Sequence, residues 1–114
     1  MSPVTYTGLR IAEGGAVVMK QVDDLAPAEL PLRHDLRNHS PTGPEWGYQG
    51  SGPAQLALGM LADVMGDRFA ELHYQEFKRA VVARFPREGF YITAEAIEEW
   101  ARTIEDQEQH DATE

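Results

Sequence analysis

Residues 39–57 read HSPTGPEWGYQGSGPAQLA, with two aromatic residues set among four glycines and three prolines. Glycine and proline at this density indicate a tightly turned loop. The apolar run at its end indicates the start of a helix, with Ser51 or Gly52 as the N-cap. Pro53 then takes the first helical position, where a missing N–H costs no hydrogen bond. The stretch therefore separates two regions of different structure.

Three helices are expected after this loop. The first, from Pro53 to about Met65, has so broad an apolar face that we expect it to be central and covered on most sides. Asp67 can cap a second helix that runs to about Phe85, before Pro86. Thr93 can cap a third helix that runs to about Gln107. Its expected inward residues are Ile97, Trp100, Ala101 and Ile104.

The region before the loop has the pattern of strands. Val4–Arg10 and Gly15–Gln21 are rich in β-branched and apolar residues, and a glycine-containing turn separates them, which predicts a β-hairpin. Leu32–Leu36 alternates briefly and is a possible third strand. We therefore predict an α+β fold, in which an N-terminal β-hairpin, as a small antiparallel sheet, packs against about three α-helices.

The size of the chain fits one domain. It has 114 residues, of which 42% are apolar, enough for one modest core. Along it we expect a β-rich part (1–36), the loop rich in glycine, proline and aromatic residues (37–52), three helices (53–107) and a frayed acidic tail (108–114).

Composition narrows the environment and the chemistry. The chain has no cysteine, which excludes disulfides and thiol catalysis and fits a reducing compartment. The start of the sequence lacks the pattern of a signal peptide, and no apolar run has the roughly 20 residues that span a bilayer. We expect a cytoplasmic protein that does not bind membranes.

Charge is concentrated at one end. The net charge is −9, and from Glu88 onward there are nine acidic residues and only one basic residue, Arg102. Direct binding to duplex nucleic acid is not expected, because phosphate contacts need clustered Lys and Arg. The acidic end either meets a basic partner or only aids solubility.

The helix start offers one candidate site. Gly50, Ser51 and Gly52 can turn backbone N–H groups toward an anion, and Arg33, Arg37 and His39 lie shortly upstream. A phosphate or carboxylate could bind there. The alternative is structural, in which the glycines form a tight elbow and Ser51 caps the helix.

The aromatic pair offers another candidate site. In an extended segment Trp46 and Tyr48 point to the same face, and with Gln55 they could contact a partner protein. The alternative is that both aromatic residues close over a small core.

Catalytic and metal sites have little support. Ser51 lacks the flanking glycines of a nucleophile elbow, with Gln49 and Pro53 at those positions. His34, Asp35 and His39 lie close in sequence without a further ligand. We predict no catalytic residue, no metal site and no cofactor. His73, on an apolar helix face, is expected to be a hydrogen-bonded core residue.

The segment from Leu36 to Asp67 resembles the core motif of a small family of uncharacterised bacterial, archaeal and phage-associated proteins, a domain of unknown function. The resemblance covers nearly the whole chain, and two departures, Pro44 and Gln49, replace a bulky apolar residue and a glycine. It adds no catalytic residue, and it implies accessory or host-modulating roles. The matching features are Tyr6, Gly8, His39-Ser40-Pro41, Glu45-Trp46-Gly47-Tyr48, Gly50 to Ala57, and Tyr74 to Arg84 with Pro86.

Three functions remain open from the sequence. The first is a small non-enzymatic interaction or regulatory module that binds a protein partner. A phage or mobile element could encode such a module. The second is an anionic-ligand-binding domain or enzyme that uses the glycine-rich helix start. The third is an acidic mimic of nucleic acid that blocks a nucleic-acid-handling protein. The partner and the oligomeric state are left open.

Overall fold

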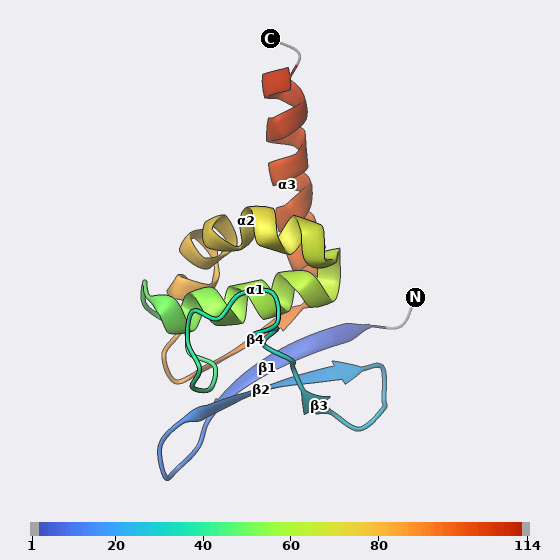
Figure 1. The fold of residues 1–114 in the computed structure, drawn as a ribbon. Helices are drawn as coiled ribbons and strands as arrows, with labels where there is room; N and C mark the ends of the chain where they lie inside the picture. Colours follow the sequence, from blue (N-terminus) through green and yellow to red (C-terminus); the bar gives the residue numbers. More distant parts are fainter. Residues whose placement is uncertain (1–2, 113–114) are drawn as a thin grey trace.

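A computed structural model of the chain describes residues 3–112, with side chains up to Glu108. Its elements follow one another in the order shown in Figure 1. They are β1 (Val4–Arg10), β2 (Ala16–Val22), β3 (Ala28–Glu29), α1 (Ser51–Met65), α2 (Asp67–Ala80), the 3-10 turn η1 (Val82–Arg84), β4 (Gly89–Thr93) and α3 (Ala94–Ala112).

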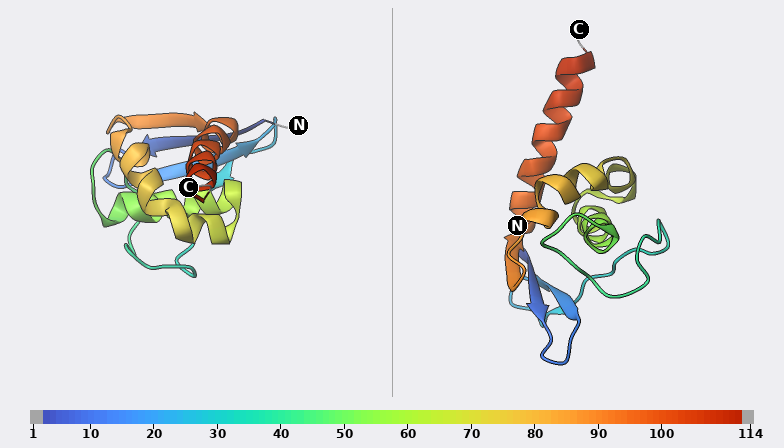
Figure 2. Two further views of the ribbon diagram at one scale, coloured as in Figure 1. Left: turned by 90° about the horizontal axis from the view of Figure 1, so that it is seen from above. Right: turned by 90° about the vertical axis from the view of Figure 1, so that its left-hand side faces the viewer.

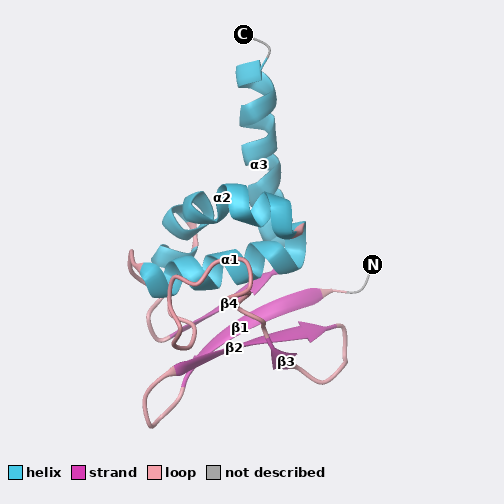
Figure 3. Ribbon diagram, in the orientation of Figure 1, coloured by secondary structure: helices cyan, strands magenta, loops and turns pink. Residues whose placement is uncertain are grey.

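The four strands form one antiparallel sheet in the order β3-β2-β1-β4. The helices all lie on one face of this sheet, and α3 rises away from it (Figures 1 and 3). The predicted α+β fold and the N-terminal hairpin are confirmed. Within residues 3–112, none of the helices combines the length and the apolar character needed to cross a bilayer.

The prediction of a strand at Leu32–Leu36 was wrong. That segment is a turn, because Arg33 has a left-handed backbone (φ 59°) that breaks an extended strand. The third strand is β3, and it pairs only with Met19 and Lys20. The fourth strand, β4, returns from the helical part of the sequence to pair with β1.

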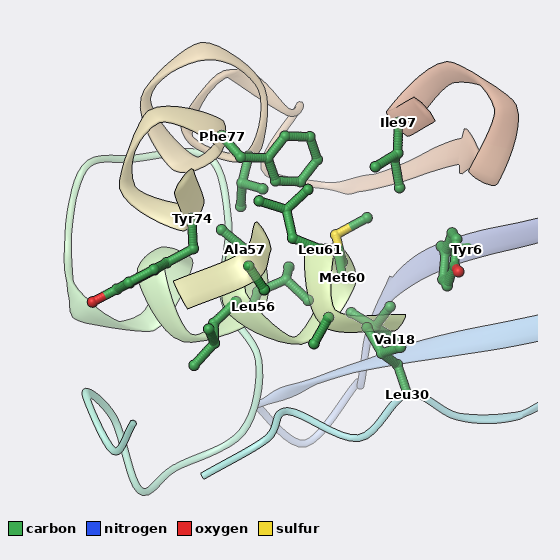
Figure 4. Packing of buried hydrophobic residues seen from close by; sticks show 14 of the residues in the cluster. Tyr6, Val18, Leu30, Leu56, Ala57, Met60, Leu61, Tyr74, Phe77 and Ile97 are labelled. Atoms are coloured by element: carbon green, nitrogen blue, oxygen red, sulfur yellow. The ribbon is translucent and has the colours of Figure 1, made fainter. Parts of the chain in front are cut away.

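The core surrounds α1, as its broad apolar face predicted. Every residue of α1 from Gly52 to Ala62 is buried. Side chains from both layers converge on it, among them Tyr6 from β1, Phe77 from α2 and Ile97 from α3 (Figure 4). The helix that starts at the end of the loop is therefore the centre of the molecule.

The helix ends differ from the predictions in detail. Gly50, not Ser51 or Gly52, is the N-cap of α1, and no side chain caps it. Because Pro53 still lies in the first turn, its missing N–H leaves no carbonyl unpaired. Thr93 does cap α3, since its Oγ1 accepts the N–H of Ala96 at 3.0 Å. That helix continues to Ala112, beyond the expected end near Gln107.

Candidate functional site

Gln55 holds the loop that precedes α1. Its side chain is fully buried in α1, and its Nε2 donates to the carbonyls of Leu32 (2.7 Å) and Arg37 (3.0 Å). Its Oε1 accepts the backbone N–H of His39 at 2.8 Å and, more weakly, that of Ser40 at 3.4 Å. One amide thus satisfies backbone groups along nine residues of loop, which removes Gln55 from the surface that could meet a partner.

The histidines of this loop also have partners within the protein. His34 donates from Nε2 to the carbonyl of Ser40 at 2.7 Å, and the ring of His39 hydrogen-bonds the hydroxyl of Tyr74. Asp35 pairs with Arg33. The side chains of His34, Asp35 and His39 therefore diverge, and no cluster of three metal-ligating residues occurs among the described residues.

Trp46 anchors the loop to the sheet. It is fully buried, its Nε1 donates to the carbonyl of Pro86 at 3.0 Å, and its ring meets that of Phe90 edge-on at 5.0 Å. The guanidinium of Arg10 lies 4.1 Å above the Trp46 ring and pairs with Glu45 at 2.7 Å. This is the core alternative of the sequence analysis, and it leaves Trp46 with no exposed surface.

The prediction that Trp46 and Tyr48 share one face was wrong. Gly47 between them has φ 87°, a left-handed conformation that ends the alternation of an extended segment. A Cβ on Gly47 would lie 2.8 Å from Cγ of Arg87, so the close approach also needs glycine. As a result Trp46 points inward, whereas Tyr48 is 38% exposed.

Tyr48 covers the start of α1. A Cβ on Gly50 would lie 2.7 Å from the Tyr48 ring, and one on Gly52 would lie 2.8 Å from Cβ of Glu45. The glycines at this helix start therefore make room for the side chains of Tyr48 and Glu45. Ser51 is exposed beside them. The neighbouring Glu45 carboxylate is already paired with Arg10 at 2.7 Å.

Arg33 lies at the other end of α1 from this helix start. It pairs with Asp35 at 3.0 Å and with Asp67, the first residue of α2, at 2.8 Å. Hydrogen bonds from Arg33 hold the pKa of both carboxyls below their usual value. Since α1 is 15 residues long, Arg33 is about 20 Å from Gly50 along the helix axis. The structure therefore does not bring Arg33 to the predicted anion site, and Arg37 contributes its backbone carbonyl to the bonds of Gln55.

A polar group that the sequence did not point to joins the sheet to α1. The hydroxyl of Tyr6 donates to Asp63 at 2.5 Å, and Lys20 pairs with the same carboxylate at 2.8 Å. Burial, followed by the bond to Asp63, raises the pKa of Tyr6 well above its usual value. In the sequence, the only hint of this polar group is that Tyr6 and Lys20 are separated by an even number of positions, which places both side chains on the inner face of the hairpin.

His73 links the two outer helices. Its Nδ1 contacts Glu76 at 2.8 Å, and its Nε2 contacts Glu108 of α3 at 2.7 Å. Its side chain is 13% exposed and packs against the ring of Phe69 at 4.6 Å. The hydrogen-bonded histidine expected at this position therefore joins α2 to α3.

Besides a small hollow of about 180 Å³ that Arg33 and Asp63 help to line, two larger hollows lie at the surface of the described chain. The first, of about 380 Å³, lies between β2 and residues 41–44 of the loop, and His34 and Glu29 are among its polar lining residues. The second, of about 660 Å³, lies where α3 leaves the sheet and is lined by Pro3, Val4, Thr93, Ala94, Glu95, Glu98 and Arg102. Neither hollow contains the predicted binding residues of residues 46–55.

The outer surface of α3 is acidic. The helix stands out from the body in Figure 1 and in the right panel of Figure 2, and within residues 3–108 none of its carboxylates except Glu108 makes an ion pair. Arg102 is the single base between Glu88 and Glu108. The carboxylates concerned are Glu95, Glu98, Glu99, Glu105 and Asp106.

No curated protein and no solved structure matches the chain. A family described as a "Family of unknown function (DUF6166)" matches residues 6–103. The match runs from β1 through about half of α3 and includes the loop with Trp46 and Gln55. The chain therefore belongs to this family of unknown function.

Proposed function

We propose that the protein is an interaction module that presents α3 to a basic surface of a partner protein. The observation that carries the proposal is the acidic face of α3, which stands clear of the body without neutralising partners among residues 3–108. A surface of one sign attracts a partner of the opposite sign and speeds its approach. By contrast, the side chains of Trp46 and Gln55 are buried and make contacts only within the protein.

The body can serve as a rigid mount for this helix. Ile97 and Ala101 are fully buried. Trp100 packs against Phe77 of α2, with 5.0 Å between the ring centroids. His73 adds a polar contact further along, at Glu108. Because these contacts hold the inward side of α3, the carboxylates on its other sides are presented in a fixed arrangement, which lowers the ordering cost of binding.

Affinity capture with charge-reversed bait tests the proposal. The bait is the wild type beside a variant of α3 with Glu99→Lys, Glu105→Lys and Asp106→Lys. A matched control makes the same change of charge at exposed residues of the body, Glu13→Lys, Asp24→Lys and Glu29→Lys. We expect a protein that wild type and control retain, that the α3 variant loses, and that is released as salt rises above about 0.15 M.

Two results would contradict the proposal. One is capture that is equal for the α3 variant and the wild type, and the other is capture that does not respond to salt. Duplex DNA added as a competitor then identifies the kind of basic surface. Displacement by DNA indicates that α3 occupies a nucleic-acid-binding surface, which is the mimic hypothesis, and retention indicates another basic surface.

A further inference from the structure

The two edges of the sheet are built differently. β3 has only two residues, flanked by Pro27 and Pro31, and includes Glu29; short length, proline and charge all protect an edge from pairing. β4 has five residues, Gly-Phe-Tyr-Ile-Thr, with neither proline nor charge. In the left panel of Figure 2 it forms the border of the described chain, with no segment beyond it.

The register shows which residues of β1 face β4. Two backbone bonds flank the β1–β2 ladder, one from the N–H of Asp23 to the carbonyl of Pro3 (2.7 Å) and one from the N–H of Ile11 to the carbonyl of Gly15 (3.2 Å). On the β1 side, both bonds use an odd-numbered residue, Pro3 or Ile11. Because hydrogen-bonded pairs alternate along an antiparallel ladder, odd-numbered residues of β1 bond to β2. The even-numbered residues of β1 therefore bond to β4.

The same alternation fixes the outward groups of β4. Tyr6 and Gly8 lie opposite Ile92 and Phe90, so the backbone groups of these two β4 residues point inward. The backbone groups of Gly89, Tyr91 and Thr93 point outward.

Two of the outward groups are already used within the chain. The N–H of Gly89 donates to the carbonyl of Pro86 at 3.2 Å. Thr93 is the N-cap of α3, and the carbonyl of an N-cap residue accepts the first hydrogen bond of the helix. Four groups on the edge have no partner within residues 3–112. These are the N–H and carbonyl of Tyr91, the carbonyl of Gly89 and the N–H of Thr93.

We infer that β4 pairs antiparallel with β4 of a second copy, across a two-fold axis at Tyr91. In this pairing Tyr91 exchanges both of its bonds with Tyr91 of the second copy, and the carbonyl of each Gly89 accepts the N–H of Thr93 of the other copy. All four groups are satisfied, and the two that the pairing leaves out are those already bonded. The free groups of β4 are therefore self-complementary about Tyr91.

Charge and area set the strength of the pairing. β4 itself carries no charged residue, so two chains of net charge −9 can pair there without a carboxylate on the pairing strands, yet the acidic α3 helices of both copies rise on the same side of the joined sheet. Salt therefore strengthens the dimer, whereas it weakens binding of α3 to a basic partner. A strand of five residues is only about 17 Å long, so its edge buries far less than the roughly 1,200 Å² of a stable interface and the dimer is weak.

Sedimentation equilibrium and amide exchange test the inference on the full chain. The apparent mass should rise toward twice the monomer value between about 10 µM and 1 mM protein, and should rise further as salt is added. Over the same range the N–H groups of Tyr91 and Thr93 should become protected from exchange. That of Gly89, which is already bonded, should not change.

Three variants make the test specific. Tyr91→Pro removes the outward N–H without breaking a bond within the chain, and Tyr91→Lys places like charges opposite each other with the backbone intact. Both should remain monomeric. Leu9→Lys changes another exposed residue of the same sheet face, on β1 (50% exposed), and should still dimerise. A wild type that stays monomeric throughout, or a dimer that Tyr91→Lys leaves intact or that Leu9→Lys dissociates, would overturn the inference.

Discussion

Gln55 is the residue on which the loop most depends. Its fully buried amide bonds the backbone of Leu32, Arg37 and His39 at 3.0 Å or less. Gln55→Leu keeps the volume but leaves these backbone groups unpaired, so we expect the free energy of unfolding to fall by about 2–4 kcal/mol.

Urea unfolding measures the loss at Gln55, and amide exchange locates it. The N–H of His39 should lose its protection in Gln55→Leu. Gln49→Leu, at an exposed position six residues earlier, is the control and should unfold as the wild type does. A change below about 0.5 kcal/mol in Gln55→Leu would show that water replaces the amide.

The contribution of Tyr6 to the free energy of unfolding is expected to fall at alkaline pH. Its hydroxyl is buried and bonded to Asp63, so its pKa is raised in the folded state. A raised pKa means that this contribution is present below the unfolded value of about 10 and is lost as pH rises above it. We expect Tyr6→Phe to cost about 1–3 kcal/mol at neutral pH.

The difference between Tyr6→Phe and wild type should therefore shrink above about pH 10 in urea unfolding at several pH values. Tyr91→Phe, at a tyrosine that is 66% exposed, is the control for removal of a hydroxyl. A difference that stays constant from neutral to strongly alkaline pH would contradict the role of the Tyr6 hydroxyl.

At the scale of elements, Gly8 allows β1 and β4 to pair beneath the loop. A Cβ at Gly8 would lie 2.1 Å from Cε2 of Phe90. Phe90 has little room to move, because its ring stacks on Phe85 at 4.1 Å and meets Trp46 at 5.0 Å. Gly8→Ala should therefore lower the free energy of unfolding by about 1–3 kcal/mol.

The matched control for Gly8 is Gly43→Ala, whose Cβ would meet only the carbonyl of Ala16 at an ordinary 3.6 Å. Thermal or urea unfolding should leave this control within about 0.5 kcal/mol of wild type. Equal stability of Gly8→Ala and Gly43→Ala would mean that the aromatic cluster shifts without cost.

Patterns local in sequence predicted the elements, and contacts distant in sequence decided the site. The hairpin and the three helices follow from apolar spacing. The pairing of β4 with β1 joins residues more than 80 positions apart, such as Gly8 and Phe90, and no local pattern specifies it. Gln55 reads in sequence as one polar residue of a helix, and the left-handed Gly47 reverses the expected direction of Tyr48.

At the scale of the whole molecule, charge and core are separated. The core surrounds α1, whereas most of the net charge of −9 comes from the last quarter of the sequence. Packing therefore stabilises the body, and like-charge repulsion opposes the folding of α3.

Repulsion of this kind is screened by salt, so the melting temperature of the wild type should rise by a few degrees, about 2–5 °C, between low and high ionic strength. The variant with Glu99→Lys, Glu105→Lys and Asp106→Lys should show a smaller rise, because it reduces the crowding of carboxylates on α3. Reversal of Glu13, Asp24 and Glu29 leaves α3 unchanged and should keep the response of the wild type. Thermal unfolding followed by circular dichroism measures all three proteins at a fixed low concentration, which holds self-association constant. The same salt response in the α3 variant and the wild type would place the repulsion elsewhere than on α3.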